Sequence, residues 1–467
     1  MFRSGGFQGG ARTAASPAVT ALMALAVVTL STRVMPALPR GEQGAKAFQG
    51  LDKDLHQAMI SNNTTEAIKA VDALAATGDP AAIDIIIKQA LTGVNYEVEK
   101  HAGAILAGTS EPKIRERVYE GIRKNSNHRT RIVLIAVAAR IADDPAAMTA
   151  IHGAVKDPSK AVALSALQWI RKIGRKDSIE PLIAELQARQ AKALDRVYFD
   201  IEKTLRVLTG AELDAAVDWQ NYWDARKRGV AQPAAKKSRG RTEVAHRDSF
   251  FSVMVDSDSV LFVIDVSESM TVRDPFQEAP AKKEDDHRGV TVAPKKEERK
   301  DGTTVKPAAS LPMERQRLYR VKEELIRVVS GLQSTTRFGI LSFNHEFKYL
   351  WDARVLKNAT PEAKAAAVSW VKSLTASGAT RTDLVLKEAL SIPDVDTIFL
   401  LTDGAPKDER NQRLPIEPIL ALAKEQNRFV RARINTISFQ QIRDAKMRTF
   451  VRELAQQNDG GEPTWLP

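Results

Sequence analysis

Turn signals recur at a nearly constant interval in the first half of the chain, and this interval is the strongest constraint on its fold. Each turn contains an acidic residue, and three of the four acids are followed by proline: Asp79-Pro80, Glu111-Pro112, Asp144-Pro145 and Asp177. Successive acidic positions are 32, 33 and 33 residues apart. Proline suits the first turn of a helix, and an acidic residue there interacts favourably with the helix dipole. A two-helix unit of this length cannot bury its apolar stripe alone, so the pattern predicts stacked helical hairpins over residues 51–228.

One stretch of this region, residues 158–187, closely resembles a HEAT repeat. It contains a first helix ending in Ile-Gly, an acidic turn, and a second helix bearing Ile179, Leu182 and Leu186. The last unit contains Trp219 and Trp223 at i,i+4, which we expect to close the end of the apolar core rather than to form an exposed docking site. Because such solenoids present an extended surface, we expect the helical repeats to hold a protein partner.

From residue 250 onward, short apolar runs alternate with helical stretches. We expect strands at residues 259–266, 337–344, 397–404 and 433–439, and helices at residues 314–332, 361–374, 382–390, 416–426 and 444–457. This alternation predicts a mainly parallel sheet covered on both faces, with sites at the carboxyl ends of the strands. The expected fold class is therefore α + α/β. An all-α, HEAT-like solenoid is followed, after a flexible basic linker at residues 229–249, by a Rossmann-like doubly wound domain at residues 250–467.

Polar residues follow two of the expected strands and precede one of the helices. Asp265, Ser267 and Ser269 lie in "DVSES", Thr380 lies in "SGATRTD", and Asp403 lies in "LLTDG". Each motif alone is common in turns and helix caps. Together, in this order, they resemble the metal-ion-dependent adhesion site (MIDAS) of the von Willebrand factor type A (VWA) family, over roughly residues 258–466.

The resemblance implies a role for each of these five residues. Ser267, Ser269 and Thr380 would be direct or near-direct metal ligands, Asp265 and Asp403 would act partly through water, and an acidic group of a protein partner would complete the coordination shell. The residue types agree with this, because all five are oxygen donors, which suit Mg²⁺, with Mn²⁺ or Ca²⁺ as alternatives. Two carboxylates roughly neutralise a divalent ion and leave positions for water or a partner's oxygen.

Two features depart from the family pattern. Glu268 stands where many relatives have glycine. It either points away from the ion, or it raises the affinity or changes the preferred metal. In addition, residues 271–312 are rich in mixed charge and proline where a short loop is expected, which predicts a disordered insertion.

The charge distribution argues against nucleic-acid binding, although the formal net charge is +11. Residues 1–40 carry a local charge of +4 and residues 229–248 one of +3, so only +4 remains for the rest of the chain. A nucleic-acid-binding domain would be expected to concentrate its basic residues on one face.

The N-terminal 40 residues have the layout of an export signal. Arg3 and Arg12 precede an apolar run at residues 18–30, which at ~1.5 Å per residue spans roughly 20 Å, short of the ~30 Å hydrocarbon core of a membrane. We therefore expect a periplasmic, cell-envelope or extracellular protein, held at the membrane only if this signal peptide remains as an anchor.

These observations lead to three classes of function. We expect an adhesion or scaffold protein that binds an acidic partner group through the cation while the helical repeats hold a second protein. The alternative is a ribonucleoprotein component, since the Ro autoantigen family has a similar architecture. An enzyme is not expected, because the chain has no cysteine, no Gly-x-Ser-x-Gly and no phosphate-binding Gly-x₄-Gly-Lys.

Overall fold

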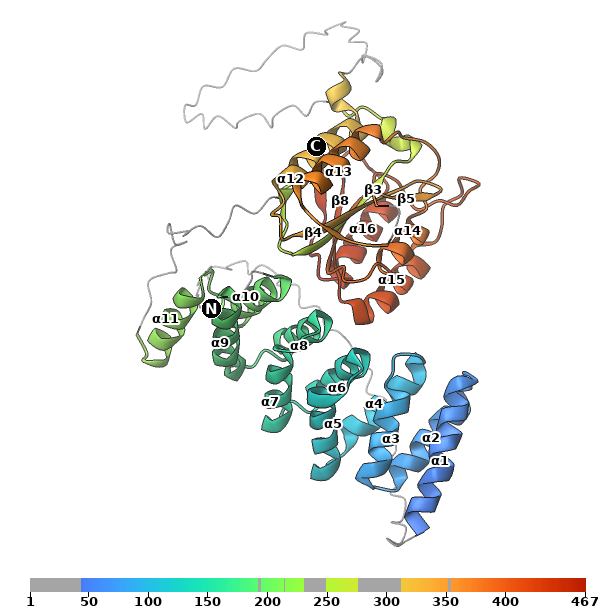
Figure 1. Cartoon of the computed structure of the whole chain (residues 1–467), viewed down its shortest axis with the longest axis vertical. Coiled ribbons are helices and arrows are strands. Elements are labelled where there is room, and N and C mark those ends of the chain that lie inside the picture. The colour runs from blue at the N-terminus through green and yellow to red at the C-terminus, as the bar shows by residue number, and fades with distance from the viewer. Residues whose placement is uncertain (1–42, 192–194, 214, 231–248, 276–311, 352–353) are drawn as a thin grey trace, which may run out of the picture. The chain divides into compact units, whose positions relative to one another are not determined.

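The computed structural model describes residues 43–191, 195–213, 215–230, 249–275, 312–351 and 354–467 (Figure 1). The expected export signal, most of the expected linker and most of the expected insertion lie outside these residues. Within the described part of the chain, none of the helices combines the length and the apolarity that a membrane span requires.

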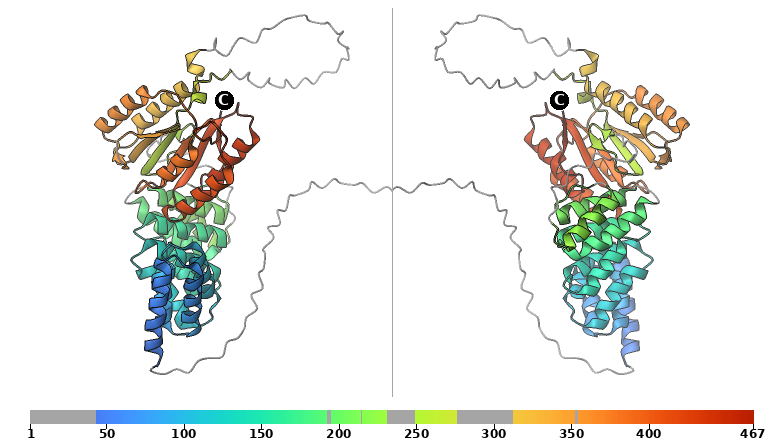
Figure 2. Two further views of the ribbon diagram at one scale, coloured as in Figure 1. Left: turned by 90° about the vertical axis from the view of Figure 1, so that its right-hand side faces the viewer. Right: turned by 90° about the vertical axis from the view of Figure 1, so that its left-hand side faces the viewer.

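The described residues from Gln43 to Lys227 are almost entirely helical and form hairpins stacked in two layers (Figures 1 and 2). In one layer, each helix contacts the next of α2 (Thr64–Ala76), α4 (Tyr96–Gly108), α6 (His128–Arg140), α8 (Lys160–Ile173) and α10 (Arg196–Thr209). The other layer contains α1 (Gln43–Ile60), α3 (Pro80–Ala90), α5 (Pro112–Lys124), α7 (Pro145–Ala154), α9 (Ile179–Gln190) and α11 (Ala216–Lys227). The prediction of an all-helical first region is confirmed.

The regularly spaced acidic turns begin the helices of this second layer. Asp79 accepts a hydrogen bond from the Ala81 backbone N–H, and Asp144 accepts one from the Ala146 N–H, each with proline at the first helical position. Such N-caps satisfy donors that the helix itself leaves without partners. Asp177 instead lies in a short 3₁₀ turn, η1 (Lys176–Ser178), that leads directly into α9. The repeat interval in the sequence is therefore the interval between successive helix starts in one layer.

The two tryptophans of α11 close the end of the stacked helices. Trp219 is completely buried in the apolar core that runs through the helical region, and Trp223 packs against that core while partly exposed. Tyr222 contacts Trp219 edge to face, with ring centroids 6.2 Å apart. The prediction that this pair caps the core is confirmed.

The second region is built on a mostly parallel sheet with strand order β5-β4-β3-β7-β8-β9. The parallel strands are β3 (Ser259–Asp265), β4 (Arg337–Phe343), β7 (Thr397–Leu401), β8 (Arg433–Phe439) and β9 (Thr464–Leu466). The antiparallel β5 (Phe347–Tyr349) and β6 (Lys357–Asn358) pair with β4, and β1 (Ser249–Phe250) pairs with β2 (Val253–Met254) in a separate ribbon. The four long strands begin where the sequence predicts them.

Helices cover both faces of this sheet, as the sequence predicts for buried parallel strands (Figure 2). Phe262 and Ile264 of β3 face a core formed with α12 (Arg317–Gly331) and α13 (Pro361–Ser373). Leu261 and Val263 face the opposite core. That core includes α14 (Thr382–Ala389), α15 (Ile416–Val430) and α16 (Ala445–Gln457). The predicted doubly wound α/β fold is confirmed.

The helical region contacts the amino ends of the parallel strands. Lys160 of α8 forms ion pairs with Asp258 and Asp396, which immediately precede β3 and β7. Arg196 of α10, which is fully buried, donates to the carbonyl oxygens of Asp396 and Arg431. These contacts join α8 and α10 to the amino ends of the parallel strands. This is the end of the sheet opposite the carboxyl ends.

A second group of contacts comes from the end of α15. Phe429 is 9 % exposed and belongs to the apolar core of the helical region. Its neighbour Arg428 donates two hydrogen bonds of 2.9 Å to the carboxylate of Glu99 in α4. Burial raises the pKa of Glu99, and the positive charge of Arg428 lowers it. Because burying the carboxylate costs free energy that offsets the ion pair, the pair mainly fixes how α15 is oriented against α4, and the buried apolar area of Phe429 stabilises the contact.

Candidate functional site

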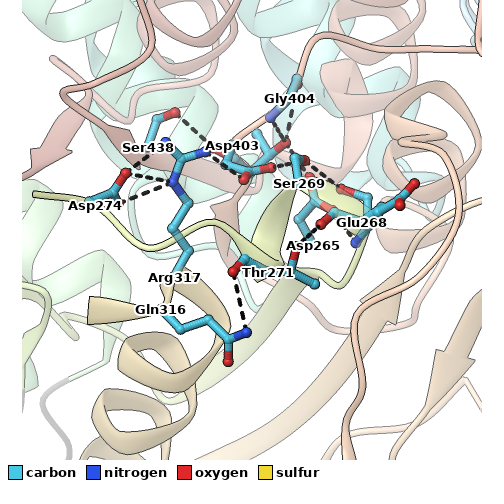
Figure 3. Close-up of polar contacts among 12 residues, drawn as sticks. Asp265, Glu268, Ser269, Thr271, Asp274, Gln316, Arg317, Asp403, Gly404 and Ser438 are labelled. Carbon is cyan, nitrogen blue, oxygen red and sulfur yellow. Dashed lines mark hydrogen bonds and ion pairs between the residues drawn. The ribbon is translucent and has the colours of Figure 1, made fainter. Parts of the chain in front are cut away.

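The two aspartates of the expected site follow neighbouring strands. Asp265 is the last residue of β3, and β7, which pairs with β3 in parallel, ends at Leu401, two residues before Asp403. Since parallel strands end at the same edge of a sheet, both carboxylates lie at this edge (Figure 3). Both are buried, with Asp265 fully inaccessible and Asp403 5 % exposed.

The turn after β3 brings its two serines to Asp403. The Ser267 backbone N–H donates to Asp265 Oδ1 at 2.8 Å, which fixes the turn, and η2 (Glu268–Thr271) follows. The Ser267 and Ser269 hydroxyl oxygens are 3.1 Å apart, and Ser269 Oγ donates to Asp403 Oδ1 at 2.6 Å. Side-chain oxygens of Ser267, Ser269 and Asp403, from two separate segments of the chain, therefore lie next to one another along this edge.

The loop that carries Thr380 is held against the same turn. The Glu268 N–H donates to the Gly378 carbonyl at 3.0 Å, and the Lys407 N–H donates to the Thr380 carbonyl at 2.8 Å. A Cβ added at Gly404 would lie 3.0 Å from Thr380 Oγ1 and 3.7 Å from Ser269 Oγ. Both hydroxyls therefore border the same small space over Gly404, beside Asp403.

Burial and mutual repulsion shift the acidity of the two carboxyl groups. Burial, and then the charge of Asp403, raise the pKa of Asp265 to about 7. Burial also raises the pKa of Asp403, against the opposing effects of the Ser269 hydrogen bond and the positive charge of Arg317. Two buried carboxylates at one edge thus create a strongly negative position that a cation would stabilise.

Three further residues belong to this arrangement that the sequence did not reveal. Thr402 donates to Asp265 Oδ2 at 2.7 Å and so occupies its second oxygen. Arg317, at the start of α12, donates to Asp403 Oδ2 at 2.9 Å, and its other nitrogens donate to Asp274. Thr402 stands inside the "LLTDG" motif and could have been suspected there, whereas Arg317 and Asp274 have no local signal.

The structure describes Glu268 and the first residues of the expected insertion, the two departures from the family pattern. The Glu268 side chain is exposed, and its carboxylate points away from Asp265 and Asp403 in Figure 3. The expected insertion begins at Thr271, but the described residues up to Pro275 are ordered by contacts with the start of α12. Most of the insertion, residues 276–311, lies outside the described residues.

The donor set fits a hard divalent cation better than a soft one. The described residues contain no group of three or more His, Cys, Asp or Glu side chains placed to hold a metal. A cation here would instead take two carboxylates with the hydroxyls of Ser267, Ser269 and Thr380, which is oxygen chemistry suited to Mg²⁺, Mn²⁺ or Ca²⁺. The residues present therefore fit such an ion, because their side chains are oxygen donors and lie close together.

Comparison with known proteins agrees with the fold of this region. Residues 312–461 match a family model described as the von Willebrand factor type A domain. The match begins after the "DVSES" turn, so it includes the Thr380 and Asp403 segments but not Asp265, Ser267 or Ser269.

Two solved structures are similar to part of the chain. A von Willebrand factor type A protein from Catenulispora acidiphila is 16% identical, covers 44% of this chain and 38% of its own, and has a TM-score of 0.29. A mutant of the PilB minor pilin from Streptococcus sanguinis is 14% identical, covers 44% of this chain and 55% of its own, and has a TM-score of 0.26. In both cases less than two thirds of the other protein is matched.

Proposed function

We propose that the C-terminal region, of which residues 312–461 match the von Willebrand factor type A domain, binds a protein partner through a divalent cation. Asp265, Ser267, Ser269, Thr380 and Asp403 would hold the ion. The observation that carries this proposal is the convergence of side-chain oxygens at the carboxyl edge of the sheet. There, Ser269 Oγ lies 2.6 Å from Asp403 Oδ1 and 3.1 Å from Ser267 Oγ.

The bound ion would supply a Lewis-acidic position that a carboxylate of the partner can coordinate. The protein's own residues hold the ligands in place for this. Thr402 and the Ser267 N–H orient Asp265, and the Gly378 carbonyl anchors the turn that carries the serines. Mg²⁺ is the ion we propose, since only two carboxylates and several neutral hydroxyls are offered.

The helical region has two layers with different roles. The layer that includes α4, α8 and α10 supplies Glu99, Lys160 and Arg196, which contact the amino ends of the strands or α15. We therefore assign the second protein partner to the other layer, which contains α1, α3, α5, α7, α9 and α11. We also propose that the chain is exported and has no enzymatic activity. We do not favour RNA binding, because the basic excess lies mainly in residues 1–40 and 229–248.

Isothermal titration of the full chain with Mg²⁺ tests the metal site. Asp265→Asn should abolish binding, because it removes a buried negative charge at the site and preserves the shape of the side chain. Asp394→Asn is the matched control. Asp394 is exposed, precedes β7 at the opposite end of the sheet and has φ of 63°, which asparagine tolerates. Mg²⁺ binding by Asp265→Asn that is measurable and as tight as that of the wild type would refute the proposal.

The partner is tested separately. A pull-down with the full chain from an envelope fraction should recover a protein in Mg²⁺ that is lost in EDTA and lost with Asp265→Asn. Retention of that protein by Asp265→Asn in Mg²⁺ would show that its binding does not use this site.

A further inference from the structure

Arg317 lies beside the candidate metal site and is buried between two carboxylates (Figure 3). Its Nη1 donates to Asp403 Oδ2 at 2.9 Å, its Nε donates to both oxygens of Asp274 at 3.0 and 3.1 Å, and its Nη2 donates to Asp274 Oδ1 at 2.8 Å. Arg317 is 8 % exposed and Asp274 is 1 % exposed. Its guanidinium carbon also lies 4.9 Å from the centroid of the Phe439 ring. A cation held on so many sides has a fixed position and is shielded little by solvent.

The two oxygens of Asp403 are divided between the metal site and Arg317. Oδ1 accepts from the Ser269 hydroxyl and faces the cluster of hydroxyls, whereas Oδ2 accepts from the guanidinium. Asp403 therefore has a permanent positive charge as its neighbour, whether or not an ion is bound. Among the residues that the structure describes, Asp265 has no such partner, since its oxygens accept from a backbone N–H and from the Thr402 hydroxyl.

The position of Arg317 is also tied to the turn that carries the serines. The Arg317 N–H donates to the Val272 carbonyl at 3.0 Å, and the Asp274 N–H donates to the Arg315 carbonyl at 3.0 Å. Val272 in turn donates to the Ser269 carbonyl at 3.1 Å. The segment after the motif and the start of α12 thus form one hydrogen-bonded unit that holds the guanidinium at the edge of the site.

We infer that Arg317 is a positioning residue that sets how strongly the site binds a divalent cation by itself. The inference rests on the proposed function, because it concerns the same ion. The guanidinium offsets part of the charge of Asp403, the ligand that it contacts directly, so Asp403 attracts a bound Mg²⁺ less strongly than a carboxylate without a cationic neighbour would. Such a site binds the ion weakly alone and gains most when an anionic oxygen of a partner arrives. Arg317 therefore favours ion binding together with a partner's carboxylate over ion binding without it.

The test compares two variants that share a neutral residue at position 274. Removing Arg317 alone would leave the buried Asp274 with only a 3.6 Å ion pair to Arg320 among the described residues and would endanger folding. In Asp274→Asn, Arg317 remains and has only Asp403 as a carboxylate partner, so Mg²⁺ should bind about tenfold more weakly than to the wild type. In Asp274→Asn with Arg317→Met, the guanidinium is gone and Mg²⁺ should bind about tenfold more tightly than to the wild type.

Two further measurements separate the effect of the positive charge of Arg317 from the effect of its shape and hydrogen bonds. Arg317→Lys keeps the positive charge and should bind Mg²⁺ within about threefold of the wild type, which a purely structural role of the guanidinium fork would not allow. Titration of the Mg²⁺-loaded proteins with acetate, as a simple carboxylate, should give weaker binding for the double variant than for the wild type. Circular dichroism and thermal unfolding in EDTA verify that each variant is folded before its titration is interpreted.

The outcomes distinguish the role of Arg317 from the proposed metal site itself. Equal Mg²⁺ affinity in the wild type and the double variant, or weaker binding by the double variant, overturns the role of Arg317 and leaves the proposed metal site standing. Binding by the double variant but not by the wild type supports the inference in its strongest form. If no folded form of the chain binds Mg²⁺, both the inference and the proposed function are wrong.

Discussion

Gly404 offers the sharpest test of the site, because its missing side chain leaves the space that the hydroxyls border. A Cβ placed there would lie 3.0 Å from Thr380 Oγ1, tighter than ordinary van der Waals contact, and 3.7 Å from Ser269 Oγ. Mg²⁺ requires oxygens at ~2.0–2.1 Å, so ligands that share one ion must approach closely. Gly404→Ala should therefore either fill the space itself or push Thr380 out of the coordination shell.

The same substitution should cost little stability. Gly404 does not have a left-handed backbone conformation, so alanine is allowed there. Replacing glycine by alanine restricts the unfolded chain and stabilises by about 0.4–1 kcal/mol, which offsets part of the close contact with the Thr380 hydroxyl. We expect the free energy of unfolding to change by less than about 1 kcal/mol. The affinity for Mg²⁺ should fall at least about 100-fold, equivalent to ~2.7 kcal/mol.

Isothermal titration with Mg²⁺ and urea denaturation in EDTA measure the two effects separately. Gly153→Ala is the matched control, since Gly153 lies in α7 with no atom within 4 Å of an added Cβ. It should raise the stability by about 0.5–1 kcal/mol, as for an ordinary helix position, and leave Mg²⁺ binding unchanged. If Gly404→Ala binds Mg²⁺ as tightly as the wild type, the ion does not occupy the space between Thr380 and Ser269 and the assignment of these ligands is wrong.

Three other predictions concern the core of the helical region, its contact with α15 and the acidity of Asp265. Trp219→Ala should lower the free energy of unfolding of the helical region by ~3–5 kcal/mol, measured by urea denaturation, because a fully buried indole leaves a cavity; a loss below about 1 kcal/mol would contradict its role as a cap. Phe429→Ala should increase hydrogen exchange in α4 and α6, and Val94→Ala, at a 69 % exposed side chain, should not; equal protection in both variants would contradict anchoring by Phe429. The pKa of Asp265 is raised to about 7 in the folded protein. Without metal, the stability that its protonated form contributes is therefore fully present below the pKa of the unfolded chain and is lost as the pH rises through about 7. Asp265→Asn should remove this decline from thermal unfolding curves recorded in EDTA, and an unchanged decline would count against the raised pKa.

The local sequence pattern was sufficient to predict the elements that carry the five expected ligands. The strand that ends at Asp265 and the strand before Asp403 are short, apolar and bounded by turn residues, so their position at one sheet edge follows from parallel topology alone. The structure places Thr380 beside them, as the order of the motifs suggests. The identity of the ion and of the partner remains a prediction, since those depend on chemistry that the chain itself does not contain.

The residues that the sequence missed act through tertiary contacts. Arg317 follows a long charged segment, and nothing in the local pattern distinguishes it from the other basic residues there. Its role depends on the closure that brings Asp274, 43 residues earlier, against the start of α12. The same holds for Lys160 and Arg196, which are ordinary helix residues in sequence and become contacts to the α/β domain only once both regions are folded.

The positions of these contacts bear on how the two regions could work together. Asp258 and Asp396, which pair with Lys160, precede β3 and β7, whereas Asp265 and Asp403 follow the same two strands. The seven residues of β3 therefore separate the docked end from the candidate site by roughly 20 Å. The helical region contacts the end of the sheet opposite the candidate site, so these contacts leave the carboxyl edge free of the helical region. A partner bound to the outer helical layer and a partner bound through the ion would then occupy separate surfaces, which lets one chain hold both at once.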